Sequence, residues 1–148
     1  MMPIQSPALI KRMLFVGVAY YLGAWLGVSH TITPEGIAIL WPPNAVLLSA
    51  FLLSPYRHWP YLGVAALIAE CIADASAFPL LAAVAFGLIN LFETSLAAYL
   101  IRRVVGERFD FDRLEHGVYF LLYGPLLASS LAALLGAQVY LVLGRSES

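Results

Sequence analysis

Residues 80–101 read LLAAVAFGLINLFETSLAAYLI, an apolar run with a single acid that is followed directly by Arg102 and Arg103. An α-helix rises about 1.5 Å per residue, so this run can cross a hydrocarbon core about 30 Å thick. It therefore predicts a transmembrane helix that ends at the two arginines.

The composition of the whole chain supports the same prediction. Of its 148 residues, 61% are hydrophobic and 11% are charged, and the mean hydropathy is +0.85. An ordinary soluble domain has about 45 to 50% apolar and about 25% charged residues, so a water-soluble globule is excluded. The net charge of −1 also argues against a nucleic-acid partner, which requires a basic face. We expect an all-α, polytopic membrane helical bundle in contact with lipid.

Five apolar runs are long enough to be membrane spans, and they leave no sequence for a soluble domain. They are residues 9–28, 37–53, 61–77, 80–101 and 117–143. Lys and Arg stay on the cytoplasmic side during insertion, and a cytoplasmic N-terminus places seven of the eight basic residues there. We therefore expect residues 1–148 to form a single membrane domain, multi-pass in the cell inner (plasma) membrane.

The second run is interrupted by Trp41, Pro42 and Pro43. A proline lacks a backbone N–H and disfavours helical backbone in the preceding residue, so a straight helix through Trp41 is not expected. A helix that starts at Pro43 and ends at Leu53 spans only about 17 Å, too short to cross alone. The break predicts a recess on the outer half, lined by free backbone groups. The alternative is a kink that serves packing only.

Polar residues in the third and fourth spans are the second unusual feature. Glu70 and Asp74 are four residues apart, and Asn90 and Glu93 are three apart, so each pair lies on one helix face. Counted from the cytoplasmic ends of their helices, Glu70, Asn90 and Glu93 lie at depths of about 12 to 16 Å. We expect them to form one polar cluster. It is either an interhelical clamp or a site for a ligand or a proton, and Asp74 has the alternative of a plain helix-end role.

Aromatic and small residues favour packing and interface roles. Tyrosines and tryptophans, among them Tyr20 and Trp41, include many near span ends, a pattern typical of the membrane–water interface. Small residues recur every four positions at Ala19 and Gly23, and at Ala83 and Gly87, which indicates close helix contacts.

Metal, cofactor and catalytic motifs are not found in the sequence. His30, His58 and His116 lie in different connections, and Cys71 is the single cysteine. There is no glycine-rich phosphate loop and no nucleophile elbow. We expect no cofactor, no metal site and no enzymatic activity.

Several motifs resemble, in order, those of the MASE1 family of bacterial integral-membrane sensory domains. They are YYLGAWLG at 20–27, WPP at 41–43, YLG at 61–63 with residues 70–79, residues 87–103, FDRL at 111–114 and residues 121–136. The resemblance implies a sensory module that acts with a histidine kinase, as in two-component systems, or with a diguanylate cyclase, and that can form a homodimer. The family's later spans and output domain are not found in the sequence, so we expect a truncated sensor, a stand-alone relative or a fragment.

The combined reading is a sensory or ligand-binding module whose stimulus is unknown. A small ligand is expected to enter from outside near the broken span. The candidate ligand-binding residues are Trp41, Pro42, Pro43, Asn44, Glu70, Asp74, Asn90 and Glu93. The alternatives are a small solute transporter or substrate-capture subunit that uses the acids for proton coupling, and a structural subunit of a membrane complex, which requires a closed polar cluster with no cavity beside it.

Overall fold

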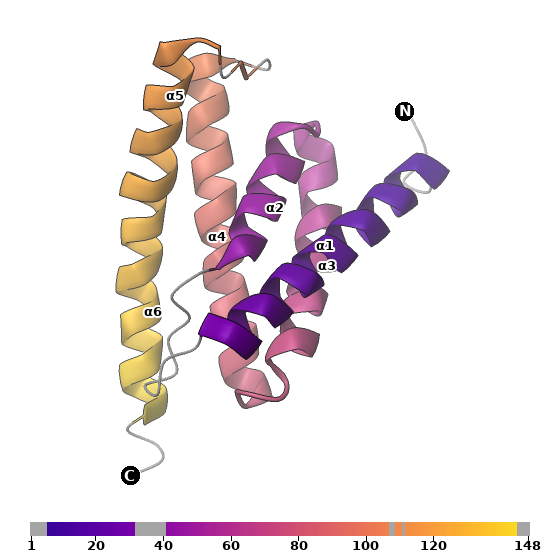
Figure 1. The fold of residues 1–148 in the computed structure, drawn as a ribbon, viewed down its shortest axis with the longest axis vertical. Coiled ribbons are helices and arrows are strands. Elements are labelled where there is room, and N and C mark those ends of the chain that lie inside the picture. The colour runs from indigo at the N-terminus through magenta and orange to yellow at the C-terminus, as the bar shows by residue number, and fades with distance from the viewer. Residues whose placement is uncertain (1–5, 32–40, 107–108, 111, 145–148) are drawn as a thin grey trace.

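The computed structural model describes residues 6–31, 41–106, 109–110 and 112–144, and within these ranges every regular element is helical. The elements form an elongated bundle in which α5, η2 and α6 follow one another as a single rod beside α4 (Figure 1). In chain order they are α1 (Pro7–Thr31), α2 (Pro42–Leu52), the 3-10 helix η1 (Tyr56–His58), α3 (Trp59–Asp74), α4 (Leu80–Val105), α5 (Leu114–Leu121), the π-helix η2 (Leu122–Ala128) and α6 (Ser129–Gly144).

The predicted all-α membrane bundle is confirmed. Three helical segments are long and apolar enough to cross a membrane by themselves, namely Pro7–His30, Leu80–Val105 and Leu114–Val142. The helices α2 and α3 are shorter, with 11 and 16 residues. The prediction of five crossings therefore depends on these two shorter helices, and it stays a prediction.

The predicted break in the second span is also confirmed. Trp41 precedes α2 with φ −124° and ψ 76°, which is not helical backbone. The helix starts at Pro42, one residue earlier than predicted, because a proline fits the first helical turn, where no N–H donor is needed. The part of the predicted span at residues 37–40 lies outside the described residues.

The third helix ends at Asp74, three residues before the end of the apolar run at 61–77. The Asp74 carbonyl accepts the backbone N–H groups of Ala77 and Phe78, each at 2.9 Å, and these bonds close a turn. Pro79 follows Phe78 and disfavours helical backbone there. The apolar character of residues 75–78 therefore belongs to a turn between α3 and α4.

Small residues let α1, α2, α3 and α4 pack closely. A Cβ built on Gly23 of α1 would lie 3.2 Å from the backbone nitrogen of Pro43, and one on Gly87 of α4 would lie 2.6 Å from a methyl group of Leu67 in α3. These contacts confirm the predicted packing role of the two glycines. Pro43 itself is fully buried by this contact.

The rod of α5, η2 and α6 packs mainly against α4. Its wide turn η2 contains Pro125, which cannot donate a backbone hydrogen bond, and a π-helical turn accommodates this gap. Leucines on its outer face, such as Leu126 and Leu134, are exposed, as expected for side chains that contact lipid.

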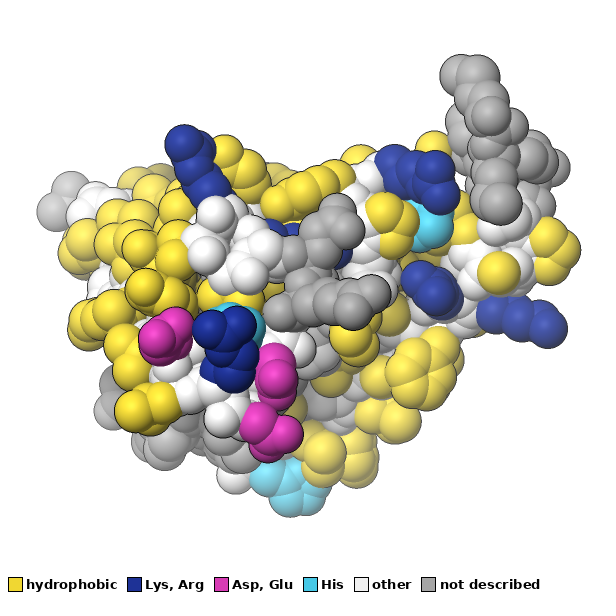
Figure 2. Space-filling model, turned by 90° about the horizontal axis from the view of Figure 1, so that it is seen from above, with side chains coloured by type: hydrophobic (Ala, Val, Ile, Leu, Met, Phe, Trp, Pro, Cys, Tyr) yellow, Lys and Arg dark blue, Asp and Glu magenta, His cyan; other side chains and the backbone are white. Residues whose placement is uncertain are grey.

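Charged side chains gather at one end of the bundle, where the α2–α3 and α4–α5 connections lie (Figure 2). The described Lys and Arg residues are Lys11, Arg12, Arg57, Arg102, Arg103 and Arg113, and all of them belong to this end. Apolar side chains dominate the flanks of the molecule. Three described acids, Asp110, Asp112 and Glu115, lie at the same end, so its basic residues are in excess, and we call it the basic end.

Candidate ligand-binding site

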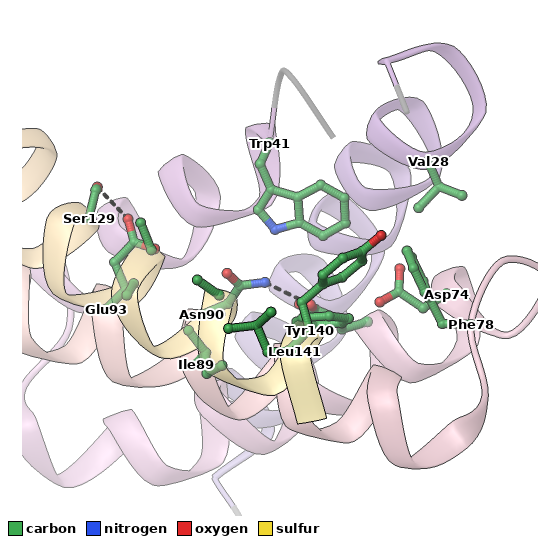
Figure 3. Close-up of a pocket in the computed structure, with 16 residues that line it drawn as sticks. Val28, Trp41, Asp74, Phe78, Ile89, Asn90, Glu93, Ser129, Tyr140 and Leu141 are labelled. Carbon is green, nitrogen blue, oxygen red and sulfur yellow. Dashed lines mark hydrogen bonds between the residues drawn. The ribbon is translucent and has the colours of Figure 1, made fainter. Parts of the chain in front are cut away.

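A cavity of about 690 Å³ lies between α1, α3, α4 and α6, away from the basic end (Figure 3). It is near the C-terminal ends of α1, α3 and α6 and the N-terminal half of α4. Its lining residues are Val28, Trp41, Glu70, Asp74, Phe78, Phe86, Ile89, Asn90, Glu93, Ser129, Ala132, Ala133, Gly136, Ala137, Tyr140 and Leu141.

Glu70 is held by side chains from two other helices. Its side chain is 0% exposed. The Tyr20 hydroxyl of α1 donates to its Oε2, and Asn90 Nδ2 of α4 donates to its Oε1 at 2.7 Å. Gly87 lets α4 approach, because a Cβ there would lie 3.6 Å from the carboxyl carbon of Glu70. Both carboxyl oxygens are therefore satisfied by donors from the bundle.

Glu93 lies one turn after Asn90 on α4, and donors from the bundle hold it in the same way. Its Oε2 accepts from Asn44 Nδ2 at 2.9 Å, and its Oε1 accepts from the Ser129 hydroxyl at 2.5 Å. Asn44 Nδ2 also lies 3.4 Å from Asn90 Oδ1, which joins the two glutamates into one set of hydrogen bonds. We call this set the polar network; its members are Tyr20, Asn44, Glu70, Asn90, Glu93 and Ser129.

Asp74 differs from the two glutamates. It is the last residue of α3, as a helix-end role requires, but its side chain is only 2% exposed and one oxygen, Oδ1, has no hydrogen-bond partner. A buried polar atom without a partner costs about 1 to 3 kcal/mol, so an oxygen in this state on a cavity wall suits a ligand's donor.

Trp41 brings an aromatic ring to the same cavity. Its indole is directed into the cavity from the start of α2 (Figure 3). Its buried Nε1 interacts with Tyr20 but makes no hydrogen bond of normal geometry. The break before α2 thus places a large aromatic side chain beside the polar network.

The structure brings together most of the predicted site residues. Trp41, Glu70, Asp74, Asn90 and Glu93 all line the cavity. The predicted cluster of Glu70, Asn90 and Glu93 forms through the hydrogen bonds described above.

Three predicted residues take other positions. Asn44 is not on the cavity wall, but it reaches the wall by its bonds to Asn90 and Glu93. Pro42 and Pro43 do not line the cavity; Pro43 packs against Gly23. The prolines therefore position Trp41 and Asn44 and shape the bundle.

Two members of the polar network were missed. Tyr20 is 1% exposed in the middle of α1, so it does not belong to the interface. Its mid-span position was the available signal, because interface tyrosines lie near helix ends. Ser129 falls within an apolar run, and a hydroxyl in the middle of a span marks a helix contact.

The described residues contain no group of three or more His, Cys, Asp or Glu side chains that could hold a metal ion. The cavity has an apolar wall with several fixed polar groups, a combination typical of sites for organic ligands.

Comparison with known proteins gives one result. The MASE1 family model matches residues 12–147, which is nearly the whole chain. No curated protein and no solved structure matches it. The motifs, the helical bundle and this match agree, and the chain belongs to the MASE1 family of membrane-associated sensory domains.

Proposed function

We propose that this MASE1 domain detects a small molecule that binds in the cavity between α1, α3, α4 and α6. The observation that carries the proposal is that the cavity wall includes most of the polar network that joins these helices. A ligand on this wall contacts the groups that fix the helices relative to one another. The domain's role is to sense, and catalysis belongs to a partner.

The proposed mechanism is a shift between two arrangements of the rod formed by α5, η2 and α6. Ser129 and Glu93 provide a side-chain hydrogen bond between this rod and α4, at the cavity wall. A ligand shifts such an equilibrium only by its difference in affinity for the two states. A ligand that contacts α6 together with α3 and α4 binds the two arrangements with different affinity. We propose that the resulting change in arrangement is transmitted to a kinase or cyclase partner, or to a second copy of the chain.

The proposal is tested by filling the cavity. A Cβ at Gly136 would meet no atom within 4 Å, and Gly136 lines the cavity, so the side chain of Gly136→Leu enters it. Gly117→Leu is the matched control, because Gly117 has equal space but does not line the cavity.

The measurement is mass spectrometry of small molecules released from the protein after purification from bacterial membranes. We expect at least one compound that accompanies the wild type and Gly117→Leu but not Gly136→Leu. If all three proteins release the same compounds, the cavity is not a ligand site.

We further propose that the N-terminus is cytoplasmic and that the cavity opens to the outer side of the inner membrane. The basic end, with Lys11 and Arg113, then faces the cytoplasm, in agreement with the retention of Lys and Arg on that side. In a Cys71→Ala background, a membrane-impermeant thiol reagent added outside should label Ser76→Cys but not Asp112→Cys. The opposite pattern would invert the topology.

A second candidate function is proton-coupled transport, favoured by the carboxyl groups of Glu70, Asp74 and Glu93 on the cavity wall. A transporter would accumulate its solute in vesicles that carry a pH gradient, whereas a sensor would not. The third candidate, a purely structural subunit, required a polar cluster without a cavity, and the cavity of about 690 Å³ argues against it.

A further inference from the structure

We infer that the ligand of this cavity is a small organic cation, with an ammonium or guanidinium head and an apolar body. The inference rests on the proposed function and names the ligand class of the same site. Three features of the cavity carry it: the charge of its wall, the unpartnered oxygen of Asp74 and the aromatic side chains of the wall.

The charged residues of the cavity wall are all acidic. Among its lining residues are three acids, Glu70, Asp74 and Glu93, and no Lys, Arg or His. In the described part of the chain the single ion pair, Arg113–Glu115 at 3.7 Å, lies at the basic end. Acidic groups at membrane depth pair with one another, with a cation or with a proton. A bound cation supplies the missing charge at this wall.

The unpartnered oxygen gives the position of the cationic head. Glu70 and Glu93 each have both oxygens bonded to donors of the bundle, whereas Asp74 Oδ1 is buried without a donor. Ammonium and guanidinium groups carry only donors, and their bonds to carboxylates are stronger than bonds between neutral groups. The head therefore contacts Asp74, and the two glutamates add attraction at longer range.

The rest of the wall suits an apolar body. Aromatic side chains from four segments, Trp41, Phe78, Phe86 and Tyr140, line the cavity together with the acids, and small residues of α6 line it as well. An aromatic face attracts a cation within about 6 Å of its ring centre. Such a wall favours a cation over an anion of the same shape, and it offers a neutral analogue only the apolar contacts.

The test compares three probes of matched shape on the full chain in nanodiscs of zwitterionic lipid. The probes are 2-phenylethylammonium, the neutral 2-phenylethanol and the anionic phenylacetate. Zwitterionic lipid is used because anionic lipid would attract the cation by itself. Binding is followed by the fluorescence of Trp41, with Trp41→Phe to subtract the signal of the other tryptophans.

We expect saturable binding of the cation, at least about tenfold tighter than that of the alcohol, because a charge-assisted hydrogen bond distinguishes them. Phenylacetate should not bind. This comparison uses the wild-type wall, so it does not depend on the folding of a wall variant. Equal affinity for cation and alcohol, binding of the anion, or no saturable binding of any probe overturns the inference.

Variants then locate the head. Asp74→Asn keeps the shape and removes the charge, and it should weaken cation binding by about tenfold while leaving the weak binding of the alcohol unchanged. Glu115→Gln, at the exposed basic end, is the control and should bind the cation like the wild type. An unchanged affinity in Asp74→Asn overturns the assignment.

The two proposals fail in different ways. If the alcohol binds as well as the cation and Gly136→Leu abolishes both, the cavity remains a ligand site and only the cation class is wrong. If Gly136→Leu releases the same compounds as the wild type, the proposed function fails whatever the probes show.

Discussion

The two sides of the cavity are built differently. On one side, α1 to α4 form a core in which Gly23 meets Pro43 and Gly87 meets Leu67 at close distance. On the other side, α6 packs mainly against α4. The core helices each pack against two or three others of the core, whereas α6 joins the bundle through α4 and its own rod. We propose that a ligand in the cavity moves this helix more readily than the core.

The polar network follows the same division. Inside the core, Glu70 accepts hydrogen bonds from Tyr20 and from Asn90. Ser129 is the network member on α6, and its bond to Glu93 joins α6 to α4 at the cavity wall. The network thus has a part within the core and one bond that joins α6 to α4. The following substitutions separate these two parts.

The largest effect is expected for Gly23→Leu, which breaks the core. Its Cβ would meet the backbone nitrogen of Pro43 at 3.2 Å, and this atom cannot move aside like a flexible side chain. We expect a loss of about 3 kcal/mol in the free energy of unfolding, as for an overpacked core. Gly136→Leu, on the cavity side of α6, is the control and should stay close to wild type in a thermal unfolding assay in nanodiscs. Equal stability of the two variants would contradict the comparison.

An intermediate effect is expected for Tyr20→Phe. The variant removes the donor to Glu70 Oε2 and leaves a buried carboxyl oxygen with one partner fewer. The expected loss of unfolding free energy is about 1 to 2 kcal/mol. Tyr99→Phe is the control, because Tyr99 is exposed and accepts a hydrogen bond only at the basic end. A double-mutant cycle with Glu70→Gln should show a coupling energy; additive effects would mean that the bond contributes nothing.

The smallest effect on stability is expected for Ser129→Ala, which removes the bond of α6 to Glu93. A hydrogen bond between membrane helices contributes about 0.6 kcal/mol on average. The neighbouring Ser130→Ala is the matched control, because the Ser130 hydroxyl bonds to the Leu126 carbonyl within the same rod. Hydrogen exchange should increase in α6 of Ser129→Ala and not of Ser130→Ala. An increase in α1 instead would place the weak part of the bundle in the core.

The sequence predicts the helices and the contact of Glu70, Asn90 and Glu93 because both depend on positions along the chain. Run length determines which segments span the membrane, and the rise per residue determines depth. The break at Trp41 follows from the backbone chemistry of two prolines.

Rotation of a helix about its own axis is not determined in this way, because almost every face of an apolar helix is apolar. Hence the sequence did not indicate that Tyr20 faces Glu70 or that Ser129 faces Glu93. Asp74 is predicted as a site residue because it lies one turn after Glu70 on the same helix face, but the sequence does not indicate that its Oδ1 lacks a hydrogen-bond partner.

The central claim, that a ligand in the cavity moves α6 relative to a fixed core, is tested most directly by distances between spin labels. In a Cys71→Ala background, labels on the exposed positions Ile72 of α3 and Leu134 of α6 report on the rod, and labels on Ile72 and Leu22 of α1 report on the core. On addition of the compound released from the wild-type protein, the α3–α6 distance distribution should change and the α1–α3 distribution should not. An unchanged α3–α6 distance with the compound bound would contradict the account.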